Sequence, residues 1–80
     1  MTEYHRWLRA AYLYYIEPGE DTGMSDAEWD SLSRKYLRER DQMTEPEHAP
    51  LHRDEFDGGS LFWLRRGEYP ACALSHNGQS

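Results

Sequence analysis

Two aspartates and a tryptophan stand close together in the sequence, at a spacing that could build a binding site. Trp29 and Asp30 follow Asp26 by three and four positions, so a helix would place all three side chains on one side of its first turn. Tyr14 and Tyr15 end the preceding apolar segment. A short connection makes successive helices antiparallel neighbours, which would bring the phenols to the same turn. The sequence therefore predicts one pocket formed by these five side chains.

The chemistry of this predicted pocket suits a flat, positively charged ring. Aromatic faces would stack on the ring, while carboxylates would offset its charge and accept hydrogen bonds from hydroxyl groups of the ligand. Amide N–H groups at the start of the second helix could hold a phosphate. Nicotinamide mononucleotide combines these three parts.

The same residues carry a resemblance to a known family. The runs AYLYY at residues 11–15 and SDAEWDSL at residues 25–32 resemble the N-terminal domain, called Ia, of bacterial NAD-dependent DNA ligases. The pattern of that domain is Tyr-Leu-Tyr-His, a loop, and then Asp-Ala-Glu-Tyr-Asp followed by Leu. In the family this small helical domain closes over NAD, stacks aromatic rings on the nicotinamide and contacts the mononucleotide half through its two aspartates.

Carried over residue by residue, the resemblance implies that Tyr14, Asp26 and Asp30 keep the family's identities. Tyr15 stands where the family has His, and Trp29 stands where it has Tyr. Both changes keep an aromatic ring and alter its hydrogen-bonding group. The resemblance implies that nicotinamide mononucleotide or NAD binds these five residues. Because the chain lacks an adenylation-lysine motif and a nucleotidyltransferase domain, we expect a non-catalytic binding module and not an enzyme.

The elements that must position the pocket are two helices. Apolar residues recur at helical spacing from Thr2 to Ile16, and Thr2 can cap the start. A capping box, in which Ser25 and Glu28 bond reciprocally, predicts a second helix that runs to about Arg40. Trp7, Tyr12 and Tyr36 are predicted core residues, in keeping with a 14% aromatic content.

The rest of the chain predicts less regular structure. Residues 41–59 contain two prolines and a Gly-Gly pair, which predicts a long loop with at most a short helical turn. The apolar segment Leu61–Leu64 predicts either a short third helix or a strand, with Ser60 as its cap. We therefore expect a mostly α fold: an antiparallel helix pair, a long loop and a short third helix or strand. Residues 1–74 would form one ligase Ia-like domain and residues 75–80 a flexible tail.

The charge of the chain supports an alternative function. Nine basic and fifteen acidic residues give a net charge of −6, which disfavours direct binding to nucleic acid or to an anionic membrane. A small acidic inhibitor of phage type, such as an anti-CRISPR or other anti-defence protein, could occupy the basic groove of a host nucleic-acid-binding protein. The acidic segment 45–57 would then imitate phosphates. Exposed aromatic residues on a thin core are also compatible with a homodimer.

Other features of the sequence predict little chemistry. No apolar run approaches the roughly 18 residues that span a bilayer, and the N-terminus lacks the plan of a signal peptide, so we expect a cytoplasmic protein. His48 and His52 are separated by Pro50, which argues against a metal site. The lone Cys72 has no evident activating base, which favours an idle thiol.

Overall fold

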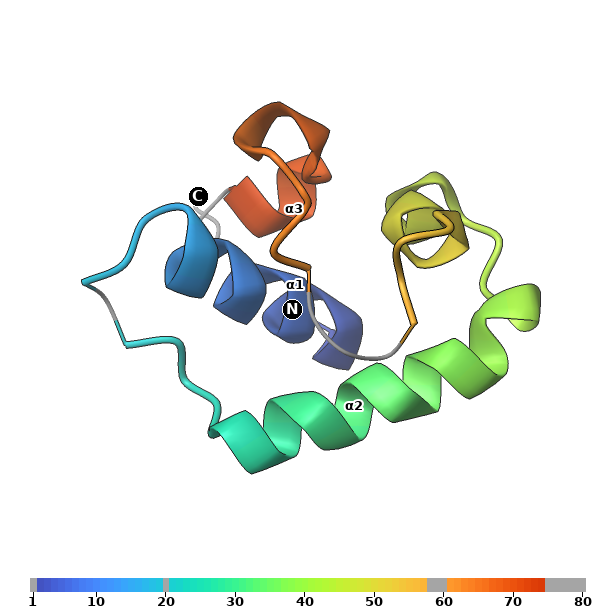
Figure 1. Cartoon of the computed structure of the whole chain (residues 1–80), viewed down its shortest axis with the longest axis horizontal. Helices are drawn as coiled ribbons and strands as arrows, with labels where there is room; N and C mark the ends of the chain where they lie inside the picture. Colours follow the sequence, from blue (N-terminus) through green and yellow to red (C-terminus); the bar gives the residue numbers. More distant parts are fainter. Residues whose placement is uncertain (1, 20, 58–60, 75–80) are drawn as a thin grey trace.

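The computed structural model describes residues 2–19, 21–57 and 61–74 of the chain. These ranges form α1 (Glu3–Tyr15), α2 (Asp26–Glu39), the short 3-10 helices η1 (Arg40–Gln42), η2 (Pro46–His52) and η3 (Arg66–Glu68), and finally α3 (Ala71–Leu74) (Figure 1). None of the described ranges forms a β-strand, so the predicted mostly α fold is confirmed. Among these residues no helix is both long and apolar enough to cross a lipid bilayer.

Helix α1 is the centre of the molecule. It begins at the predicted cap, where the Thr2 hydroxyl accepts a hydrogen bond from the backbone N–H of His5 at 3.1 Å. Helix α2 lies along one side of α1 and α3 lies along the other (Figure 1). The buried guanidinium of Arg9 donates to the carbonyl of Ala73 at 2.7 Å and so ties α3 to α1. Because it has neighbours on both sides, α1 buries eight of its thirteen residues.

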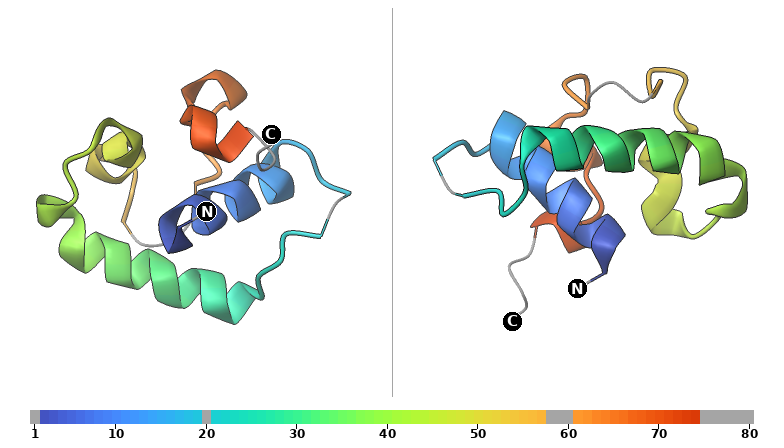
Figure 2. Two further views of the ribbon diagram at one scale, coloured as in Figure 1. Left: turned by 180° about the vertical axis from the view of Figure 1, so that it is seen from behind. Right: turned by 90° about the horizontal axis from the view of Figure 1, so that it is seen from below.

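Helix α2 is more exposed and runs against α1. The Ser25 hydroxyl accepts a hydrogen bond from the N–H of Glu28 at 3.1 Å, which is half of the predicted capping box. The described residues show no return bond from the Glu28 carboxylate. In Figure 1 the two helices run in opposite directions, and the view from below in Figure 2 shows that they cross obliquely. The antiparallel helix pair is therefore present.

Reciprocal contacts of two indoles join the helix pair. The indole N–H of Trp7 donates to the Ser33 hydroxyl at 3.0 Å, and that of Trp29 donates to the backbone carbonyl of Trp7 at 2.9 Å. The two rings stack with their centroids 5.0 Å apart. Both indole N–H groups are thus satisfied while the ring faces pack, which fixes the rotation of each helix about its axis.

The core is built mainly from rings, as the composition predicts. Trp7 is completely buried and meets Tyr36 and Phe56 edge to face. Tyr12 packs edge to face on Tyr69. The predicted core positions Trp7, Tyr12 and Tyr36 are therefore confirmed, each with 3% or less of its surface exposed.

The segment after α2 is more regular than predicted. Instead of a long loop with at most one helical turn, the chain forms η1 and then the seven-residue η2. The phenol of Tyr4 donates to the carbonyl of Glu47 at 2.8 Å. Arg40 donates to the carbonyl of Leu51 at 3.1 Å. These bonds come from distant side chains, so composition alone could not reveal them.

The prediction for Leu61–Leu64 is wrong, since this segment is neither a helix nor a strand. It forms a turn in which the N–H of Leu64 donates to the carbonyl of Leu61 at 2.9 Å. Both leucines are buried while Phe62 stays 73% exposed, so a turn suffices to bring the two apolar residues to the core. The short third helix exists, but it lies at Ala71–Leu74. Ser60 and residues 75–80 lie outside the described residues.

Candidate functional site

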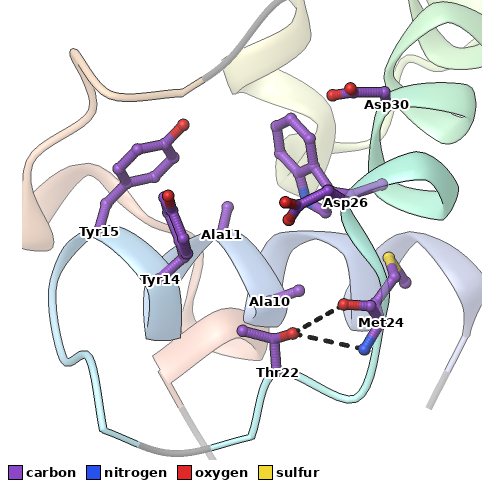
Figure 3. A pocket seen from close by; sticks show the side chains of 9 residues that line it. Ala10, Ala11, Tyr14, Tyr15, Thr22, Met24, Asp26 and Asp30 are labelled. Atoms are coloured by element: carbon purple, nitrogen blue, oxygen red, sulfur yellow. Dashed lines mark hydrogen bonds between the residues drawn. The ribbon is translucent and has the colours of Figure 1, made fainter.

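A cavity of about 260 Å³ lies where the end of α1 meets the start of α2 (Figure 3). Its walls come from the last turns of α1, from the connection between the helices and from the first turns of α2. The lining residues are Ala10, Ala11, Tyr14, Tyr15, Thr22, Met24, Asp26, Trp29 and Asp30. All five residues that the sequence predicts for the pocket line this one cavity.

The connection between the helices is shaped by its own hydrogen bonds. Gly23 has a φ of +78°, a conformation that favours glycine, and its N–H donates to the Asp21 carboxylate at 2.9 Å. The Thr22 hydroxyl lies 3.0 Å from the carbonyl of Met24 and 3.4 Å from its N–H. These bonds hold Thr22 and Met24 against the cavity, as Figure 3 shows.

The start of this connection is fixed by a polar contact outside the cavity. The phenol of Tyr12 donates to the Glu17 carboxylate at 2.7 Å, and Arg66 forms an ion pair with the same oxygen at 3.0 Å. The Tyr12 hydrogen bond, together with the charge of Arg66, lowers the pKa of Glu17. Glu17 therefore anchors the chain as it leaves α1, two residues after the cavity-lining Tyr15.

The aromatic side chains of the cavity differ in how firmly they are held. Tyr14 is 63% exposed, and its ring meets that of the half-buried Tyr15 edge to face, with centroids 4.9 Å apart. Trp29 is half-buried and fixed by its stacking on Trp7 and by its indole hydrogen bond. The cavity therefore has one rigid aromatic wall and one that is open to solvent.

The two aspartates face the tyrosines across the cavity. In Figure 3 both carboxyl groups project from α2 toward the end of α1 that carries Tyr14 and Tyr15. Asp26 and Asp30 are exposed at the rim. Within the described ranges neither carboxylate makes a hydrogen bond or an ion pair. They are thus available to accept hydrogen bonds from a ligand or to offset its positive charge.

Four lining residues are not predicted from the sequence. Ala10 and Ala11 provide room because their side chains are small. Their position in the sequence shortly before Tyr14 and Tyr15 could have indicated that they line the same pocket. Thr22 and Met24 belong to the connection, whose conformation follows from glycine dihedral angles and local hydrogen bonds. No spacing rule places such residues.

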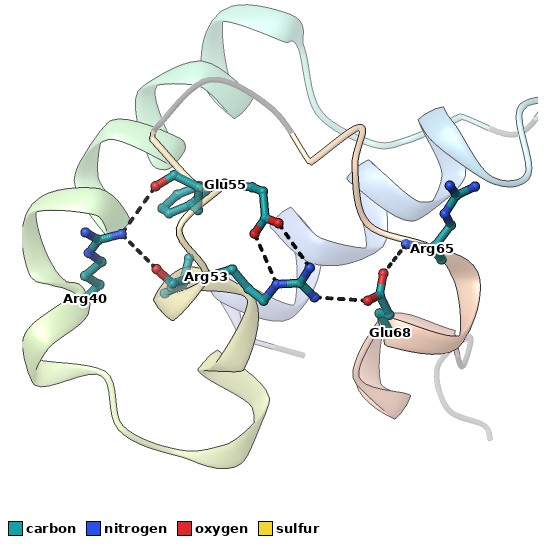
Figure 4. A network of polar contacts seen from close by, with 7 residues as sticks. Arg40, Arg53, Glu55, Arg65 and Glu68 are labelled. Atoms are coloured by element: carbon teal, nitrogen blue, oxygen red, sulfur yellow. Dashed lines mark hydrogen bonds and ion pairs between the residues drawn. The ribbon is translucent and has the colours of Figure 1, made fainter.

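Two carboxylates of the acidic segment 45–57 have partners within the molecule. Glu47 lies 3.1 Å from the imidazole of His5. Arg53 bridges Glu55 at 3.2 Å and Glu68 at 3.0 Å (Figure 4). The hydrogen bond from Arg53 lowers the pKa of Glu55. The charge of Glu55 is therefore compensated by Arg53, and Glu47 is held by its contact with His5.

A second hollow, of about 450 Å³, lies between η2 and α3 and includes Cys72. Burial raises the pKa of the Cys72 thiol, which disfavours the nucleophilic thiolate. In the described part of the chain no group of three metal-ligating side chains comes together.

Comparison with protein-family models, with curated proteins and with solved structures finds no match for this chain. The resemblance to the ligase Ia domain therefore stays a prediction. Function is inferred from the cavity between α1 and α2.

Proposed function

We propose that this protein is a non-catalytic binding module that holds nicotinamide mononucleotide, alone or as part of NAD, between α1 and α2. The observation that carries the proposal is the convergence of Tyr14, Tyr15, Asp26, Trp29 and Asp30 on one cavity. These are the residues for which the resemblance to the ligase Ia domain implies nicotinamide contacts.

The physical character of the cavity supports this ligand. A pyridinium ring can stack on the exposed faces of the aromatic residues, where cation–π attraction adds to the stacking. The unpaired carboxylates can accept hydrogen bonds from the ribose hydroxyls. A volume of about 260 Å³ lies just below the usual ligand-site range of roughly 300–1,000 Å³. The cavity therefore suits a mononucleotide better than a whole dinucleotide.

The alternative function, an acidic inhibitor of a basic groove, has weaker support. Two carboxylates of its predicted surface, the segment 45–57, have partners: Glu47 contacts His5 and Glu55 contacts Arg53. Asp26 and Asp30, which make no hydrogen bond or ion pair within the described ranges, lie at the rim of the cavity. We therefore favour small-molecule binding.

Isothermal titration calorimetry with nicotinamide mononucleotide and NAD tests the proposal. We expect a dissociation constant of about 0.1–1 mM for the mononucleotide, since a small open site forms few contacts. Tyr14→Ala should weaken binding about three- to tenfold, because it removes one aromatic wall.

Phe62→Ala is the matched control for this titration. Phe62 is 73% exposed and Tyr14 is 63% exposed, so neither truncation opens the core, but Phe62 lies outside the cavity lining. Binding by the Phe62 variant should equal that of the parent. Absence of binding at millimolar ligand, or equal losses in the two variants, would refute the proposal.

A further inference from the structure

The cavity between α1 and α2 is negatively charged, with no cation in its lining. Asp26 and Asp30 contribute two carboxylates, and no Lys, Arg or His stands among the residues described around the cavity. Arg66, near the end of α1, is engaged in its ion pair with Glu17. The electrostatic potential inside the cavity is therefore set by the two aspartates.

The aromatic lining attracts the same sign of charge. Tyr14, Tyr15 and Trp29 line the cavity, and the negative face of an aromatic ring attracts a cation. The same ring face repels an anion. The carboxylates and the faces of the aromatic rings therefore both favour a positively charged ligand.

The start of α2 provides little stabilisation for a phosphate in the cavity. Of the residues at this helix end, Ser25, Ala27 and Glu28 are not part of the cavity lining, whereas Asp26 is. The N–H of Glu28 already donates to the Ser25 hydroxyl. A phosphate drawn toward this helix end would also approach the Asp26 carboxylate, which opposes the attraction of the helix dipole.

We infer that the cavity selects its ligand by positive charge and takes an N-substituted pyridinium without a phosphate in preference to the phosphorylated form. Nicotinamide riboside is the simplest such compound, since it shares the ring and ribose of the mononucleotide. The inference rests on the proposed function and narrows its ligand class. In the mononucleotide, the ring and ribose would occupy the cavity and the phosphate would remain in solvent.

The test compares three ligands in parallel titrations of the full chain: nicotinamide riboside, nicotinamide mononucleotide, and the riboside with its ring reduced to the uncharged dihydropyridine. The riboside should bind about threefold to tenfold more tightly than either of the others, as expected for a charge difference at a solvated site. The preference over the mononucleotide should shrink as salt is added, because salt screens both carboxylates.

Variants show whether the aspartates cause the preference. Asp26→Asn combined with Asp30→Asn should reduce the preference to less than about twofold. The matched control combines Glu28→Gln with Asp41→Asn, which removes the same charge from exposed positions outside the cavity lining. This control should keep the preference of the parent, and circular dichroism should show all variants folded.

The outcomes separate this inference from the proposed function. If the mononucleotide binds as tightly as the riboside or more tightly, the charge selection is wrong while the nicotinamide site stands. If the control variant loses the preference as fully as the cavity variant, the aspartates are not its cause and the inference fails. If none of the three ligands binds at millimolar concentration, the proposed function itself fails.

Discussion

Trp29 holds the two helices together and also lines the proposed site. Its ring stacks on Trp7 at 5.0 Å and its N–H donates to the Trp7 carbonyl at 2.9 Å. The spacing of residues in the sequence predicts that Trp29 lies in the pocket. It cannot show that the same indole also joins α1 to α2, because that contact depends on the crossing of the helices.

Trp29→Phe should lower the free energy of unfolding by about 1–2 kcal/mol, because it removes a part-buried hydrogen bond and some packing surface. Trp63→Phe is the matched control, since the buried indole nitrogen of Trp63 finds no partner among the described residues. Urea unfolding should show a clearly smaller loss for the Trp63 variant. Equal losses would contradict the structural role given to Trp29.

Glu17 should make part of the stability depend on pH. The Tyr12 hydrogen bond and the Arg66 charge lower its pKa from the ordinary value of 4.5. Its contribution is therefore complete above that value and is lost as the pH falls through the lower pKa of the folded state. Glu17→Gln should lose less stability than the parent when urea midpoints are compared between pH ~5 and pH ~3.

A matched control distinguishes this effect from general acid sensitivity. Glu28→Gln removes an exposed carboxylate that makes no side-chain hydrogen bond to a described residue. Its midpoint should fall over the acid range as far as that of the parent. If the Glu17 variant is as acid-sensitive as the parent, the anchoring contact does not exist in solution.

At the scale of the elements, the start of α2 is the feature on which the site depends most. Asp26, Trp29 and Asp30 all lie within five residues of the cap at Ser25. Fraying of this helix end would move both carboxylates and the indole together. The cap is therefore important for the geometry of the cavity as well as for the helix.

Ser25→Ala should destabilise the protein by about 1 kcal/mol, because the N–H of Glu28 loses its acceptor. For a domain of this size, that loss lowers the melting temperature by about 4–8 °C. Ser31→Ala makes the same substitution at an exposed position inside α2 and should be neutral or slightly stabilising. Thermal unfolding followed by circular dichroism measures both, and an unchanged Ser25 variant would show that the cap contributes nothing.

The two long helices and their facing ends were predictable because the signals that define them are local. Caps at Thr2 and Ser25 and apolar residues at helical spacing need no tertiary information. Helix η2 is not predictable, because groups outside it, the phenol of Tyr4 and the guanidinium of Arg40, bond to its backbone. The apolar run at Leu61–Leu64 predicts a short helix or a strand there, whereas the third helix lies at Ala71–Leu74, where the distant Arg9 bonds to the carbonyl of Ala73.

For the whole molecule, the aromatic core has a consequence at high pH. Burial raises the pKa of Tyr4, Tyr36 and Tyr69 above the ordinary value of 10.0. The folded state therefore keeps phenol protons that the unfolded chain releases, so stability is complete below that value and falls as the pH rises above it. The urea midpoint should therefore be lower at about pH 11 than at about pH 8. Equal stability at both would contradict the burial of these phenols.

The convergence of two helix ends on one nicotinamide-binding cavity is the central claim, and NMR chemical-shift mapping with nicotinamide mononucleotide tests it most directly. The three indole N–H signals provide internal references, because Trp29 lines the cavity while Trp7 lies behind it and Trp63 is not among the lining residues. We predict that the ligand shifts the indole signal of Trp29 and the amides of Tyr14, Tyr15, Asp26 and Asp30, and leaves the signal of Trp63 unchanged. Shifts confined to the turn around Trp63, or no shifts at millimolar ligand, would contradict the claim.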